Sequence, residues 1–239
     1  MTSESAWADQ LAADRALLDR TSTAERVADV LRQRIIEGVL APGTRLSEET
    51  AGRALAVSRN TLREAFRLLV HERLLVHELH RGVFVRVLTA DDVIDLYRVR
   101  RLLETGAVRR ATSPPAELLT AVERAVTTGE RAAAEQRWQD VGTANMHFHR
   151  ALAALADSPR VTETMQQLLA ELRLAFHVMS RPREFHEPYL GMNREITDLL
   201  LAGANEAAAD RLEEYFDLAE EQLTNAYRSG QELITGSGA

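Results

Sequence analysis

The chain has 239 residues, of which 45% are hydrophobic, and a formal net charge of −7, so it is long enough for two domains with separate hydrophobic cores. It contains no cysteine, which excludes disulfides, thiolate zinc sites and cysteine nucleophiles. Residues 1–20 contain four acidic side chains and no long apolar run, and no later stretch is long enough to span a membrane. We therefore expect a cytoplasmic protein with no signal peptide and no membrane partner.

The N-terminal part of the chain is expected to contain an extension followed by three helices. Residues 1–22 are polar with a few spaced apolar side chains, which is typical of a weakly amphipathic extension. An apolar stripe over 23–35 predicts a helix that the Pro-Gly turn at 42–43 ends. Ser47 and Ser58 are expected to cap two further helices, because a serine hydroxyl accepts a hydrogen bond from the first helical turn.

A change of period after residue 72 predicts a pair of strands. Residues 75–79 and 83–87 are rich in β-branched and large apolar side chains, and residues 80–82 end in Gly82, which tolerates positive φ. Three helices followed by a β-hairpin is the order of a winged helix-turn-helix. We assign this domain to residues 23–88.

The third predicted helix carries three arginines at intervals of four residues, which places them on one helix face: Arg59, Arg63 and Arg67. They could be a solvated stripe paired with Glu64 and Glu72. However, residues 59–86 contain six arginines and three histidines against three glutamates. A locally basic segment in an acidic chain, placed on a winged helix, favours nucleic-acid binding.

The remainder of the chain is expected to be helical. Loops between the periodic segments are short, which favours an antiparallel bundle over 89–230. The predicted helices cover 90–104, a segment that begins after the prolines at 114–115, and then 131–156, 160–179, 189–202 and 205–229. We expect a disordered tail at 231–239. The predicted fold class is mostly α, with an N-terminal winged helix-turn-helix followed by an all-α antiparallel helical bundle.

Five segments of this sequence resemble GntR-family transcription regulators of the FadR-like branch, whose C-terminal domain is the helical FCD bundle. The segments are LSEE at 46–49, VSRNTLREA at 57–65, RGVFV at 81–85, LYRVRRLLE at 96–104 and FHRAL at 148–152. The resemblance implies a ligand-responsive, sequence-specific regulator, most often a repressor. Such a regulator binds a short inverted repeat in a double-stranded DNA operator as a homodimer.

The resemblance also implies how DNA is contacted. The helix that begins after Ser58 would enter the major groove, and the hairpin tip would approach the minor groove. Arginines at the helix start suit guanine, and hydroxyls suit phosphate, whereas Arg67 suits a phosphate contact or an internal pair. The DNA-binding residues implied are Ser58, Arg59, Asn60, Thr61, Arg63, Arg67, His80, Arg81 and Gly82.

Many FCD bundles hold a divalent metal through an aspartate and three histidines, beneath a small organic acid. The corresponding positions here are Asn145, His149, Asn193 and Tyr215. Because amide oxygens and a neutral phenol are weak ligands, we expect no tightly bound metal and no other cofactor. A weak site on Asn145, His149 and Asn193 is the alternative.

The same four side chains are expected to line a cavity for a small-molecule effector such as an organic acid. Arg100, Arg101 and Arg173 are candidates to supply positive charge. Each has a simpler interpretation: Arg100 can pair with Glu104, Arg173 can face solvent, and a buried histidine such as His149 is often only a core residue.

Two other functions compete with the ligand-responsive regulator. A helical-bundle enzyme with an appended DNA-binding lobe is disfavoured, because the sequence shows no nucleophile–base pair, carboxylate dyad, phosphate-binding loop or metal triad. A ligand-independent DNA-binding regulator with a decayed pocket is the other. In the favoured hypothesis, the effector moves the helices connected through 89–97 and changes the separation of two winged domains.

Overall fold

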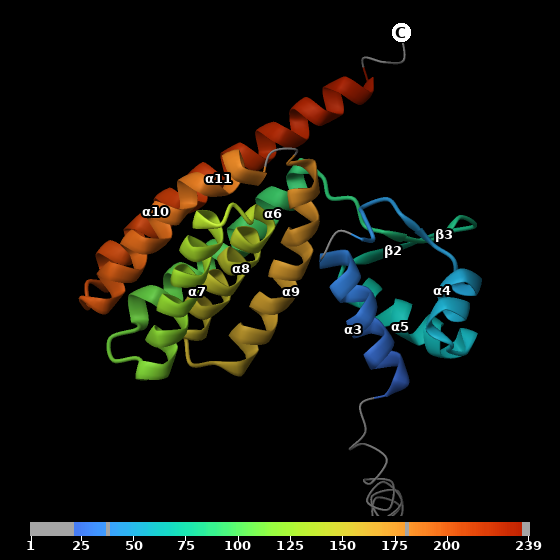
Figure 1. Ribbon diagram of the computed structural model, residues 1–239, viewed down its shortest axis with the longest axis horizontal. Helices are drawn as coiled ribbons and strands as arrows, with labels where there is room; N and C mark the ends of the chain where they lie inside the picture. The colour runs from blue at the N-terminus through green and yellow to red at the C-terminus, as the bar shows by residue number, and fades with distance from the viewer. Residues whose placement is uncertain (1–21, 37–38, 180–181, 236–239) are drawn as a thin grey trace, which may run out of the picture. The chain divides into compact units, whose positions relative to one another are not determined.

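The computed structural model describes residues 22–36, 39–179 and 182–235, which form two compact units (Figure 1). The boundary falls between Arg86 and Val87, two residues before the boundary expected from the sequence. The predicted N-terminal helix within residues 1–20 lies outside the described residues.

In its described residues, the first unit contains three helices and a small antiparallel sheet: α3 (Thr23–Ile36), β1 (Arg45–Leu46), α4 (Glu48–Leu55), α5 (Arg59–His71), β2 (Leu75–Glu78) and β3 (Gly82–Val85). The strand order is β1-β3-β2, and Leu75 pairs with Val85 in the hairpin. The hairpin is confirmed. Strand β1 was not predicted, since two residues carry no detectable period.

Local chemistry explains why α4 and α5 begin where they do. The hydroxyls of Ser47 and Ser58 accept hydrogen bonds from the backbone N–H groups of Thr50 and Thr61, at 3.2 and 3.1 Å, so both predicted caps are confirmed. Ala56 takes the left-handed conformation, with φ of 53°, in the tight connection between the two helices. Glycine is the usual residue in such a conformation, and alanine adopts it at a cost.

The core of this unit lies between α3 and α5. Leu62, Phe66 and Leu69 of α5 are buried, as are Leu31 and Ile35 of α3. A bidentate pair joins the two helices at the edge of this core, because Arg32 donates to both oxygens of Glu72 at 2.7 and 2.6 Å. Since the apolar side of α5 is fixed against α3, its arginine-bearing side is exposed.

The second unit is a helical bundle: α6 (Ala90–Arg110), α7 (Ala116–Ala134), α8 (Trp138–Ala154), α9 (Pro159–Ala175), the short 3₁₀ helix η1 (Phe176–Val178), α10 (Pro182–Leu201) and α11 (Asn205–Thr235). Helix α6 packs against α11, and α7 packs against α8 (Figure 1). The predicted combination of a winged helix-turn-helix and a helical bundle is therefore confirmed. Within the described ranges, no helix is both long and apolar enough to cross a membrane.

Three helix boundaries differ from the sequence prediction. The segment predicted as helical from 131 is interrupted before α8, where Gln136 has φ of 57°. Helix α10 begins at Pro182 and contains Pro188, although proline is unfavourable within helices; the sequence predicted its start at residue 189. Helix α11 continues to Thr235, into the segment predicted as a tail.

Candidate nucleic-acid interface and ligand pocket

The exposed side of α5 holds the three arginines predicted to contact DNA. Arg63 donates from Nε to both oxygens of Glu48, at 2.8 and 3.0 Å, and Arg67 pairs with Glu64 at 2.5 Å. Across the described segments, Arg59 makes no ion pair. The structure thus places one unpaired guanidinium at the start of α5 and two that are held by acids of the same unit.

The first turn of α5 has the features of a phosphate-binding helix start. Ser58, Arg59 and Asn60 are exposed, and the free N–H groups and positive dipole end of a helix attract anions. The hydroxyls of Ser58 and Thr61 already bond each other at 2.8 Å. Their interaction positions the turn, and phosphate contacts would add to it or replace it.

The hairpin tip is the second predicted contact. His80 in the turn has φ of 62°, and Gly82, the first residue of β3, has φ of 111°, a conformation that glycine tolerates best. Arg81 forms an ion pair with Glu78 and lies over the ring of Phe84, 5.4 Å from its centroid. Its side chain is exposed, so the pair is open to exchange with a phosphate or a groove.

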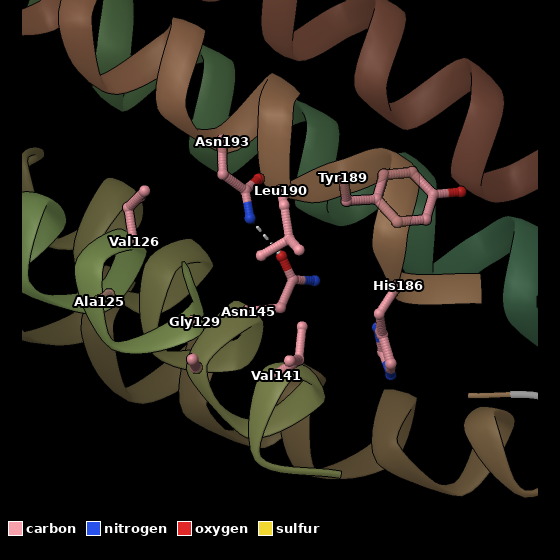
Figure 2. A pocket seen from close by; sticks show the side chains of 10 residues that line it. Ala125, Val126, Gly129, Val141, Asn145, His186, Tyr189, Leu190 and Asn193 are labelled. Atoms are coloured by element: carbon pink, nitrogen blue, oxygen red, sulfur yellow. Dashed lines mark hydrogen bonds between the residues drawn. The ribbon is translucent and has the colours of Figure 1, made fainter. Parts of the chain in front are cut away.

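In the helical unit, the four positions that the resemblance matches to metal ligands lie together, and three of them are joined by hydrogen bonds. Asn193 donates from Nδ2 to Asn145 Oδ1 at 2.7 Å (Figure 2), and Asn145 donates from Nδ2 to the hydroxyl of Tyr215 at 2.9 Å. The rings of Tyr215 and His149 meet edge to face, with centroids 4.9 Å apart. Helices α8, α10 and α11 supply these residues.

Two buried polar residues of α6, Glu104 and Arg100, lie on the Nδ1 side of His149. Its Nδ1 lies 2.6 Å from Glu104 Oε2, and Arg100 donates from Nε to Glu104 Oε1 at 3.0 Å. Burial lowers the pKa of His149, so the ring is neutral, with its hydrogen on Nδ1 toward the carboxylate. Arg100 Nη2 and His149 Nε2 are buried without hydrogen-bond partners.

These residues do not fit a tightly bound metal ion. Burial raises the pKa of Tyr215 far above its ordinary value, so its phenol stays protonated and is a poor ligand. Asn145 Oδ1 already accepts a hydrogen bond, which leaves one imidazole and neutral amide oxygens as donors. No group of three histidine, cysteine, aspartate or glutamate side chains is placed for metal binding among the residues that the structure describes.

A small hollow adjoins this group between α7, α8 and α10 (Figure 2). Its volume is about 10 Å³, which is about the space that one water molecule needs. Small apolar side chains of α7 and α8 form one wall, whereas Asn145, Asn193 and His186 provide its polar atoms. The hollow has a polar centre, and its volume is too small for a ligand larger than about one water molecule unless the surrounding helices move.

His186 is a candidate binding residue that the sequence did not reveal, because its segment FHEPY matches none of the motifs considered. It is 5% exposed, it lines the hollow, and its Nδ1 has no hydrogen-bond partner. Arg173 flanks it and lies 3.4 Å from the hydroxyl of Thr143 through Nη2. Arg101 lies elsewhere: it does not line the hollow and pairs with Glu213 and Asp217 of α11.

Comparison with known proteins agrees with both units. Residues 23–85 match the GntR family of bacterial regulatory proteins, and residues 95–218 match the FCD domain. A solved structure of a GntR transcriptional regulator from Rhodococcus sp. RHA1 is 47% identical, covers 87% of this chain and all of its own, and superposes with a TM-score of 0.82.

Two curated relatives have named operons. The Nta operon transcriptional regulator of Aminobacter aminovorans is 30% identical over 158 residues, which is 66% of this chain and 75% of the relative. The gluconate operon transcriptional repressor of Bacillus subtilis is 41% identical over 93 residues, 39% of this chain and 38% of the relative. The chain belongs to the GntR family of bacterial regulatory proteins and is a DNA-binding transcription regulator with a C-terminal FCD effector domain.

Proposed function

We propose that this protein is a repressor that binds a short inverted repeat as a homodimer and responds to a small molecule bound in its helical unit. The observation that carries the DNA-binding part is the exposed arginine face at the capped start of α5. The name of the gluconate operon relative supports the choice of repressor. A protein that binds chromosomal DNA works in the cytoplasm, and we propose no catalytic role for it.

In this proposal, the unpaired Arg59 reads a base at the start of α5, because a guanidinium suits guanine O6 and N7. Arg63 joins it after leaving Glu48, and Asn60 contacts a neighbouring base. Arg67 and Arg81 exchange their surface glutamate partners for phosphates, which costs little because exposed ion pairs are weak.

The proposed dimer has a candidate surface on the helical unit. Leu102 of α6 is 76% exposed, and a methyl group added at Gly106, one turn later, would meet no atom within 4 Å. Both residues line a groove of about 610 Å³ that also contains Arg110 and Asp157. In a dimer with a two-fold axis, Leu102 of each copy would pack against Gly106 of the other copy. Arg110 of each copy would then face Asp157 of the other.

Effector and DNA would be coupled through the helices that surround the hollow. A ligand that widens the hollow moves α8 and α10, and α6 packs against α8 through His149 and Glu104. Helix α6 begins at Ala90, soon after the winged unit ends at Arg86. A ligand that favours one arrangement of these helices would favour one spacing of the two winged units.

A ligand-independent regulator is the second candidate, and the small volume of the hollow favours it. Operator binding with and without candidate effectors separates the two. A ligand-responsive regulator changes its operator affinity with at least one metabolite, whereas a ligand-independent regulator binds the same site with the same affinity throughout.

A further inference from the structure

The outer face of the winged sheet carries an arginine that the predicted DNA contacts leave out. Arg45 of β1 lies opposite Phe84 of β3, which in turn lies opposite Val76 of β2. Residues directly opposite one another across a sheet share a face, so these three side chains are neighbours. Successive side chains of a strand alternate between faces, and the adjacent Leu46 and Val85 are buried. The face with Arg45 is therefore the side turned to solvent.

The guanidinium of Arg45 lies beside the hairpin tip. A methyl group added at Gly82 would lie 3.4 Å from Arg45 Nε and 3.7 Å from its Nη2. Arg81, next to Gly82, lies over the ring of Phe84, 5.4 Å from its centroid. Two guanidinium groups therefore adjoin residues of β3 on the outer face of the sheet.

The two arginines of this face differ in their partners. Arg81 is paired with Glu78, whereas the side chain of Arg45 is exposed and makes no hydrogen bond or ion pair with any residue in the described parts of the chain. A phosphate that approaches Arg45 displaces only water. At Arg63, by contrast, it must also break the ion pair with Glu48.

Arg45 also lies between the two regions predicted to contact DNA. Glu48, three residues later at the start of α4, pairs with Arg63 on the exposed side of α5, and three residues span at most about 11 Å. The hairpin tip lies on the other side of Arg45. A DNA strand separates the major groove from the adjacent minor groove. With α5 in one groove and the tip in the other, that strand passes Arg45.

We propose that Arg45 binds a backbone phosphate of the DNA strand that separates the major groove at α5 from the minor groove at the hairpin tip. The inference rests on the proposed docking of α5 and the hairpin, and it adds a contact that carries no sequence information. A guanidinium donates two parallel hydrogen bonds to a phosphate. Arg45 thereby fixes the register in which Arg59 meets its base.

The test measures the affinity of the full-length protein for a fluorescent duplex of random sequence at several sodium chloride concentrations. A random duplex is sufficient, because a phosphate contact does not depend on sequence. Arg45→Gln should reduce the slope of log affinity against log salt by about 0.9 for each winged unit bound, because each phosphate contact releases counterions. Arg45→Lys keeps the charge and should keep the slope.

Two controls separate this contact from other effects of the substitution. Arg124→Gln removes one charge from an exposed position of α7 in the helical unit and should leave the slope unchanged. Selection from a pool of random duplexes should enrich the same sequence with Arg45→Gln as with the unaltered protein. Because Arg45 is exposed and has no partner within the described ranges, Arg45→Gln should unfold at the same temperature as the unaltered protein.

Four results would overturn the inference: an unchanged slope in Arg45→Gln, a fall that Arg45→Lys shares, an equal fall in Arg124→Gln, or a different sequence enriched by Arg45→Gln. The proposed function fails separately. If the unaltered protein binds DNA and enriches no sequence, the reading of bases by α5 is refuted, and the salt slopes still decide whether Arg45 contacts a phosphate.

Discussion

At the scale of single residues, the clearest consequence concerns the buried histidines of the helical unit. His149 and His186 each place a ring nitrogen without a partner inside the unit, and burial lowers the pKa of both. Folding therefore favours their neutral forms. A protein built this way loses stability when acid forces these rings to take up protons.

The pH dependence follows from the pKa of His186, which is about 4 in the folded protein and 6.5 ordinarily. Above pH 6.5 the imidazole of His186 is neutral in both the folded and the unfolded protein. As the pH falls toward 4, the unfolded chain takes up the proton first, so the free energy of unfolding declines through this window. The lowered pKa of His186 contributes on the order of 3 kcal/mol to the free energy of unfolding at neutral pH. We expect His186→Gln to flatten the decline, measured by urea unfolding between pH 7 and 4. Parallel curves for the two proteins would contradict this.

Arg59 is expected to contact a base through its unpaired guanidinium. Arg59→Ala should weaken operator binding by about 1–3 kcal/mol and weaken binding to random DNA much less, because a base contact is specific. Fluorescence anisotropy with both DNAs measures the two losses. Arg109→Ala is the control, since Arg109 lies on α6 and pairs with Asp210. Equal losses on both DNAs would show that Arg59 contacts only the backbone.

Residue roles could be predicted from the sequence only in part. The spacing of the α5 arginines places them on one exposed face, and this needs no tertiary information. By contrast, the pairing of Arg63 with Glu48 joins two helices, and the meeting of Arg173, His186 and Gly142 joins three. Such contacts depend on how helices pack, which local periodicity does not specify.

At the scale of elements, the helix starts that have a capping side chain are the best-predicted features, because their signals are local. Ser47, Ser58 and the turn before α6 have cap residues that act within three or four positions. Helix ends and interruptions were less predictable. The break before α8 is made by ordinary residues, and Pro188 continues a helix that its lack of an N–H would normally disfavour.

The capping box of α6 gives a prediction at this scale. Thr89 accepts from the backbone N–H of Asp92 at 3.1 Å, and Asp92 accepts from that of Thr89 at 2.9 Å. Thr89→Ala should lower the free energy of unfolding by about 1 kcal/mol, measured by urea denaturation. Thr120→Ala is the control, because Thr120 is exposed inside α7 and bonds only the preceding turn. Equal effects of the two substitutions would argue against the cap.

At the scale of the whole molecule, the sequence predicts the order of the two units. A segment with both helical and strand periodicity is followed by a long segment with helical periodicity alone. It predicts the metal-aligned positions through a family resemblance. It does not predict that Asn145 bonds both Asn193 and Tyr215. That outcome depends on side-chain packing among three helices.

The proposed dimer is tested by Leu102→Glu. A charge in the groove that faces the second copy should disfavour association, so we expect light scattering coupled to gel filtration to show a shift from dimer to monomer, with weaker operator binding. Leu201→Glu changes another exposed leucine, outside the groove, and should remain dimeric. If Leu102→Glu also remains dimeric, the interface lies elsewhere.

The account as a whole depends on sequence-specific DNA binding by α5. The most direct measurement selects the DNA that the full-length protein retains from a pool of random sequences, and repeats the selection with Arg59→Ala. The account predicts that the protein enriches one inverted repeat and that Arg59→Ala loses or relaxes a base position in each half. Retained DNA with no shared sequence, or an identical repeat for both proteins, would contradict it.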